Sequence, residues 1–119
     1  MKKLMIAVLM LQLPGMTAFA AALSNAAVPT RIEVERGEGF TIYGNFGNPG
    51  GCTPAYANML FVKSSSPHYK EMYSVALAAF AGKYRIFAYV VNCQTITWYA
   101  NPPDTLNIVD VNSVLNVLD

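Results

Sequence analysis

The sequence predicts a mainly β fold with one helix, an α+β domain in which the helix lies between the third and fourth of five strands. Three observations predict it. Short segments place apolar residues at every second position, which is typical of half-buried strands. Residues 66–81 instead carry apolar residues at helical spacing. Glycine- and proline-containing segments separate these elements, as turns and loops require.

The first two strands are expected near residues 29–36 and 39–46. Apolar and polar residues alternate in both, which is the period of a strand with one buried face. The segment RGEG between them supplies two glycines that can take positive φ. The pattern therefore predicts a β-hairpin, with apolar positions at Ile32, Val34, Phe40 and Ile42.

Residues 57–65 are expected to form the third strand, and residues 84–92 and 105–117 the fourth and fifth. The glycine-rich segment 44–52 before the third strand predicts a loop. A phosphate-binding loop is the alternative, but it needs a Lys and a Ser or Thr at the start of a helix. Cys-Thr-Pro stands there instead, which favours a loop shaped by its cysteine.

The helix has its own start and stop signals. Ser66 is the expected N-cap, Pro67 suits the first helical position, and Gly82 is expected to end the helix in a left-handed conformation. Val75, Ala78 and Ala79 on another face are either a subunit contact or plain helix-forming residues. The stripe expected to pack on the sheet, with Phe80 buried at its end, is Tyr69, Met72, Tyr73, Ala76, Leu77 and Phe80.

This order of elements is that of an OB-fold-like five-stranded barrel with a helix between strands 3 and 4. Residues 29–119 are expected to form one such domain, because the chain of 119 residues has room for a single small core. Residues 21–28 are expected to be a flexible lead before it.

The N-terminus predicts a signal peptide over residues 1–20. Lys2 and Lys3 precede an apolar run, and a small-x-small cleavage site follows at Ala18 to Ala20. Cleavage is expected after Ala20 or Ala22, which gives a secreted or periplasmic protein. A membrane anchor is the alternative, but the Pro-Gly break after residue 13 interrupts the apolar run.

Charge and cysteine content limit the function classes. Removal of the signal peptide leaves six basic and seven acidic side chains, scattered singly, which argues against nucleic acid and anionic membranes as partners. Cys52 and Cys93 are the only cysteines, and an exported protein meets an oxidising compartment, so we expect them to form a disulfide. A catalytic thiol or a metal ligand is the alternative for either one.

No catalytic constellation is recognisable. His68 is the only histidine, and it lies near the start of a predicted helix, where a surface position is expected. No two acidic residues were recognised at a spacing that forces a carboxylate pair. We therefore expect no enzyme activity, no metal site and no cofactor.

Aromatic residues in predicted loops are the candidate ligand contacts. Trp98, Tyr99 and Asn101 combine two rings with an amide in one loop, a mixture that suits the apolar face and the hydroxyls of a sugar. Tyr56 and Phe46 are further aromatic residues in or beside loops. The alternative is that Trp98 and Tyr99 only cover the end of the sheet.

Two segments carry a family resemblance. "YKEMYSVALAAFAGKYRIFAYVVNC" at 69–93 and the "GNPGGC" that ends at Cys52 resemble small exported bacterial proteins similar to the binding (B) subunit of subtilase-cytotoxin-type AB5 toxins. The likeness covers roughly residues 29–111. It implies an OB-fold, a homopentamer, a toxin A subunit as partner and binding of sialylated or similar cell-surface glycans. The segment 21–30 lacks the polar residues that such subunits use for sialic acid, so no glycan-binding residue is transferred.

Two functions therefore follow as expectations. One is an exported, non-catalytic module that binds a cell-surface glycan. The other is an exported structural or protein-interaction protein without glycan binding, which would use an edge strand or a helix face.

Overall fold

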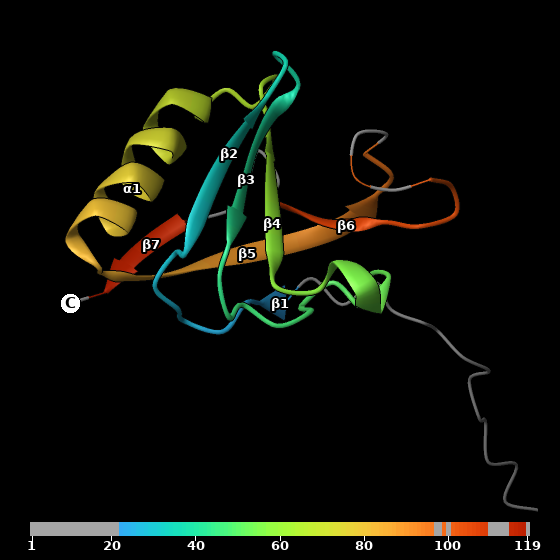
Figure 1. The fold of residues 1–119 in the computed structure, drawn as a ribbon, viewed down its shortest axis with the longest axis horizontal. Helices are drawn as coiled ribbons and strands as arrows, with labels where there is room; N and C mark the ends of the chain where they lie inside the picture. The colour runs from blue at the N-terminus through green and yellow to red at the C-terminus, as the bar shows by residue number, and fades with distance from the viewer. Residues whose placement is uncertain (1–21, 97–98, 100, 110–114, 119) are drawn as a thin grey trace, which may run out of the picture.

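The computed structural model describes residues 22–96, 99, 101–109 and 115–118. These residues form one sheet in the order β1-β5-β6-β4-β3-β2, with β7 paired to β5 beside this path, and a helix packed on the sheet (Figure 1). No helix within these residues is long and apolar enough to span a bilayer. The elements are β1 (Ala22–Leu23), β2 (Arg31–Glu35), β3 (Gly39–Tyr43), the 3-10 helix η1 (Pro54–Tyr56), β4 (Met59–Lys63), α1 (Tyr69–Gly82), β5 (Arg85–Gln94), β6 (Leu106–Val109) and β7 (Leu115–Leu118).

The α+β class is confirmed, with the helix between β4 and β5, the third and fourth of the predicted strands. The closed, five-stranded OB-fold-like barrel is wrong, because the sheet is open and has seven strands in the described chain. Two segments account for the difference. Residues 22–27, predicted as a flexible lead, pair with β5 through β1 and through a bridge from Ala27 to Ile86. The predicted strand 105–117 is divided into β6 and β7.

The division of that last strand follows from the length of β5. β5 has ten residues, and β6 and β7 pair antiparallel with its two halves one after the other. β6 also pairs in parallel with β4, whereas β7 pairs only with β5 among the described strands. The hairpin β2–β3 is confirmed, with Ile32 opposite Ile42 and Val34 opposite Phe40.

Helix α1 departs from its predicted limits and its predicted face. It begins at Tyr69 with His68 as N-cap and no side-chain capping bond, and the left-handed residue after it is Lys83 at φ 56°, in place of Gly82. Phe80 is 44% exposed and Leu77 40% exposed, so their predicted burial is wrong. The residues that α1 buries are Met72, Ala76 and Ala79. Two of these are small, so the helix can lie close to the sheet.

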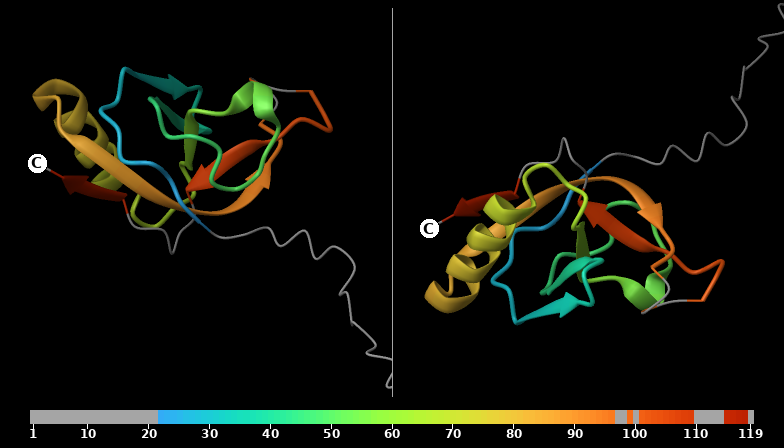
Figure 2. Two further views of the ribbon diagram at one scale, coloured as in Figure 1. Left: turned by 90° about the horizontal axis from the view of Figure 1, so that it is seen from below. Right: turned by 90° about the horizontal axis from the view of Figure 1, so that it is seen from above.

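The central strands β3, β4 and β6 are buried on both faces. The α1 side holds an all-apolar cluster that includes Phe40, Ile42, Leu60 and Val62. The opposite side holds a second cluster around Phe61, bordered by tyrosines. The turned views show α1 on one side and the η1 and 101–105 segments gathered at the other end of the curved sheet (Figure 2). Phe46, predicted to be a loop aromatic open to a ligand, is 1% exposed and belongs to the first cluster.

Candidate functional site

Two cavities lie at the end of β4 and share Lys63 and Ser65 as lining residues. We call them the outer and the inner cavity, and together the polar recess. The outer cavity has a volume of about 410 Å³ and the inner cavity about 200 Å³. The inner cavity is lined by Lys63, Ser65, Ser66, Asn92, Gln94, Ile108 and Val109.

Two of the residues that line the inner cavity each carry a polar side-chain atom without a hydrogen-bond partner. Ser66 Oγ and Asn92 Oδ1 are both buried and have no hydrogen-bond partner. Ser66 as a whole is 7% exposed. A buried polar atom without a partner costs free energy, of the order of 1–3 kcal/mol, and such atoms are rare in native proteins. Both atoms belong to residues that line one cavity, which makes this cavity the candidate site for a polar ligand.

Local structure explains why the Ser66 hydroxyl has no partner. The backbone N–H of Ser66 donates to the Lys63 carbonyl, and the Ser66 carbonyl accepts from the Tyr69 N–H. These bonds close a turn between β4 and α1. Because α1 begins at Tyr69 with His68 as N-cap, the Ser66 hydroxyl is not used as the predicted helix cap.

A register shift places Asn92 in the recess. Val90 pairs with Val109, but Asn92 pairs with the adjacent Ile108, so β5 carries one extra residue at this point. Such bulges bend a strand and redirect its side chains. Asn92 therefore lies opposite Ile108, which lines the inner cavity together with the adjacent Val109.

The outer cavity has a mixed lining. Phe61 and Ile96 are buried apolar residues, and Ser64, Ser65 and Lys63 supply polar groups. The Ser64 hydroxyl donates to the Gly37 carbonyl at 2.6 Å, which fixes this serine to the β2–β3 turn. Arg36 and Glu38 bring one charge of each sign to the rim.

The predicted loop site is divided by the structure. Trp98 lies outside the described residues, two positions after Ile96 at the wall of the outer cavity. Asn101 is exposed, and its carbonyl accepts from the Asp104 N–H at 2.9 Å. Tyr99 is half-buried and meets Phe61 edge to face, at 6.3 Å between ring centroids.

The Tyr99 hydroxyl connects its loop to the sheet. It donates to Glu35 Oε1 at 2.9 Å and accepts from Thr41 Oγ1 at 2.8 Å. Desolvation of the phenol, which outweighs the opposing hydrogen bond from Thr41, raises the pKa of Tyr99 well above its usual value. The phenol is therefore neutral and serves as a structural hydrogen-bonding group in this arrangement.

A pair of carboxylates accompanies Tyr99. Glu33 and Glu35 lie two positions apart on β2, and alternate strand residues share a face. A hydrogen bond with the Glu33 carboxyl, and then the bond from Tyr99, hold the pKa of Glu35 below its usual value. Glu33 also accepts from the Tyr43 hydroxyl at 3.3 Å and forms an ion pair with Arg31 at 2.5 Å. Strand periodicity alone predicts this pair, which was not among the expected carboxylate pairs.

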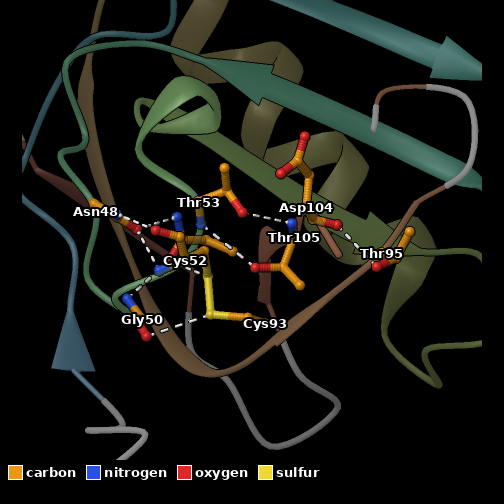
Figure 3. The surroundings of a disulfide bond; sticks show 9 residues. Asn48, Gly50, Cys52, Thr53, Cys93, Thr95, Asp104 and Thr105 are labelled. Atoms are coloured by element: carbon orange, nitrogen blue, oxygen red, sulfur yellow. Dashed lines mark hydrogen bonds between the residues drawn. A yellow bond between two sulfur atoms is a disulfide. The ribbon is translucent and has the colours of Figure 1, made fainter. Parts of the chain in front are cut away.

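The predicted disulfide between Cys52 and Cys93 is confirmed, with 5.5 Å between the Cα atoms. A polar network surrounds it (Figure 3). The Asn48 side chain bonds both the N–H and the carbonyl of Cys52, and Asn107 Oδ1 accepts from the Gly50 N–H at 2.7 Å. A Cβ on Gly50 would lie 2.8 Å from Asn107 Oδ1, which explains why glycine stands there.

The polar recess thus differs in composition from the site expected from sequence. Residues from β4, the β4–α1 turn and β5 form the recess: Lys63, Ser66, Asn92 and Gln94. No sequence motif indicates these residues. Among the described residues no group of three His, Cys, Asp or Glu side chains is placed to hold a metal ion. Comparisons with protein families, curated proteins and solved structures returned no match for this chain.

Proposed function

We propose that the mature protein is an exported, non-catalytic binding module that recognises a cell-surface glycan through the polar recess. The observation that supports it is the pair of unpartnered oxygens, Ser66 Oγ and Asn92 Oδ1, in the wall of a cavity. Sugars carry closely spaced donors and acceptors on an apolar ring, so they suit a site with a few polar groups and an apolar wall.

The outer cavity extends the same site. Its buried Phe61 and Ile96 offer apolar surface beside Lys63 and Ser65, so a second sugar ring can follow the first. Trp98, which lies outside the described residues, remains a predicted contact of the glycan. A homopentamer, which the family resemblance implies, would raise weak single-site affinities through multivalency. A toxin A subunit as partner belongs to the same proposal.

The test is glycan-array binding by the mature, disulfide-bonded protein and by two lysine variants. Lys63→Ala removes a cation from the recess, whereas Lys70→Ala removes an exposed lysine on α1. We expect Lys63→Ala to weaken binding about tenfold or more, the scale of one charge-assisted hydrogen bond, and Lys70→Ala to bind as the parent does. Absence of any bound glycan, or equal binding by Lys63→Ala, would contradict the proposal.

A protein-interaction role without glycan binding is the second candidate. It is favoured by the exposed apolar residues Leu77 and Phe80 on α1. Phe80 borders a hollow of about 640 Å³ that Val28 and Pro29 also line. An oligomer in light scattering that Phe80→Ser dissociates, together with an empty glycan array, would favour this candidate over the first.

A further inference from the structure

The inner cavity presents a specific combination of chemical groups. Ser66 offers a hydroxyl, Asn92 offers an amide, and Ile108 and Val109 offer apolar surface. A ligand group that satisfies all of them must donate a hydrogen bond, accept a hydrogen bond and carry a small apolar end. We propose that the inner cavity binds the acetamido group of an N-acetylated sugar, an inference that rests on the proposed glycan binding by the recess.

The polar half of the cavity favours a group with both a donor and an acceptor. Asn92 Oδ1 lacks a donor partner, which an acetamido N–H supplies. The Ser66 hydroxyl can donate to the acetamido carbonyl, and this removes the second unpartnered atom. A carboxylate or a phosphate only accepts hydrogen bonds when ionised, so it would leave Asn92 Oδ1 without a partner.

The apolar half of the cavity favours a methyl group. Ile108 and Val109 both line the cavity from adjacent positions of β6, where successive side chains point to opposite faces. Ile108 is 3% exposed, so the apolar surface open to a ligand is small. An acetamido methyl covers this surface and removes it from water, which is favourable in proportion to the area buried. A sugar with a hydroxyl at the same position brings hydrogen bonds but no methyl group.

The inner cavity is large enough for an acetamido group. A water needs roughly 10–15 Å³ of such a cavity, whereas the inner cavity has about 200 Å³. An acetamido group and part of its sugar ring therefore fit there and displace several waters. Both oxygens are covered in the unliganded fold. Rotation of the Ser66 hydroxymethyl group and of the Asn92 amide about single side-chain bonds is therefore part of binding.

The experiment compares methyl glycosides of N-acetylglucosamine, glucosamine and glucose, titrated into the mature, disulfide-bonded protein and followed by backbone amide chemical shifts. We expect the N-acetylated sugar to bind at least about tenfold more tightly than the other two, with the largest shifts at residues 63–66 and 92–94. Equal affinities for the three sugars would overturn the inference and leave the proposed function standing. No binding of any of them alongside a positive glycan array would also overturn it.

A serine variant separates a ligand role from a structural one. Ser66→Ala removes a hydroxyl that has no protein partner, so we expect an unchanged or higher melting temperature and a roughly 3- to 10-fold loss of N-acetylglucosaminide affinity. The control is Ser74→Ala, since Ser74 lies exposed on α1 and its hydroxyl bonds the Lys70 carbonyl. A lower melting temperature for Ser66→Ala with unchanged sugar affinity would overturn the inference.

Discussion

Asn107 and Asn92 lie on neighbouring strands, one step apart in the pairing of β6 with β5, yet their amides have opposite surroundings. Asn107 is fully buried. Its Oδ1 accepts from the Gly50 N–H, and its Nδ2 donates to Asn48 Oδ1 at 3.0 Å. Asn92 Oδ1 is buried as well, but no donor reaches it. Both amide atoms are hydrogen-bonded at Asn107, whereas the amide oxygen of Asn92 has no partner.

The difference separates two adjacent sites of the β5–β6 pair. Asn107 lies opposite Cys93 and belongs to the site that we call the disulfide end, or partnered end. There the Thr105 N–H donates to Thr53 Oγ1 at 2.9 Å, and the Asn48 amide bonds the backbone of Cys52. Satisfied polar groups of this kind hold a loop in place. The Asn92 site leaves hydrogen-bonding capacity unused, and unused capacity beside a cavity is what a ligand requires.

The largest expected effect is at the partnered end. Replacing both Cys52 and Cys93 by Ala opens a loop with a sequence separation of 41. In the chain-entropy treatment this costs about 4 kcal/mol of the free energy of unfolding. Urea unfolding of the double variant beside the oxidised parent measures it. A loss below about 1 kcal/mol would mean that the polar network, without the disulfide, holds this end together.

Asn107→Ala is expected to cost about 2–4 kcal/mol. The change leaves the Gly50 N–H without its acceptor and creates a cavity where a fully buried amide stood. Thermal unfolding is the measurement, and Asn45→Ala, at an exposed asparagine, is the matched control. Equal melting temperatures for the two variants would show that Asn107 does not support the disulfide loop.

Tyr99→Phe tests a third partnered polar group, with an expected cost of about 1–2 kcal/mol at neutral pH. The variant loses the hydrogen bonds of the phenol to Glu35 and Thr41. Because the pKa of Glu35 is lowered in the fold, its contribution to stability is present above the usual carboxyl pKa, about 4.3. It is lost as the pH falls through the folded value.

Tyr99→Phe should therefore lose less stability on acidification than the parent does, since one cause of the lowered pKa is gone. Urea unfolding between pH 7 and pH 3 measures how steeply the free energy of unfolding falls with pH in the parent and in the variant. The bond with Glu33 lowers the pKa of Glu35 more than the bond from Tyr99 does, and it persists in the variant. The loss of stability on acidification should therefore be smaller but still present. If the free energy of unfolding fell more steeply on acidification in Tyr99→Phe than in the parent, the hydrogen bond from the Tyr99 hydroxyl would not be what lowers the pKa of Glu35.

Local sequence signals predicted the elements better than the site. The hairpin β2–β3 follows from alternation and a glycine turn, and the disulfide follows from cysteine count and predicted export. The face of α1 was misassigned because Phe80 and Leu77 are more apolar than Ala76 and Ala79. Close packing on the sheet favoured the small residues instead.

The recess could not be predicted because its parts depend on details beyond local patterns. Ser66 is available only because α1 begins two residues later than its capping signals indicate. Asn92 lines the cavity after a register shift in β5, and no residue pattern marked that shift. Tyr99 bonds Glu35 across a sequence separation of 64, which periodicity does not encode.

The smallest effect on stability, and the sharpest test of the comparison, is expected for Asn92→Ala. The variant removes a buried oxygen that has no partner, so the lost packing of the amide is offset by the removal of an unsatisfied polar atom. We expect a free energy of unfolding within about 1 kcal/mol of the parent. Urea unfolding of Asn92→Ala and Asn107→Ala under one condition gives the contrast directly. If Asn92→Ala cost as much as Asn107→Ala, Asn92 would be a structural residue like its neighbour, and the recess would lose the polar atom that distinguishes it from the disulfide end.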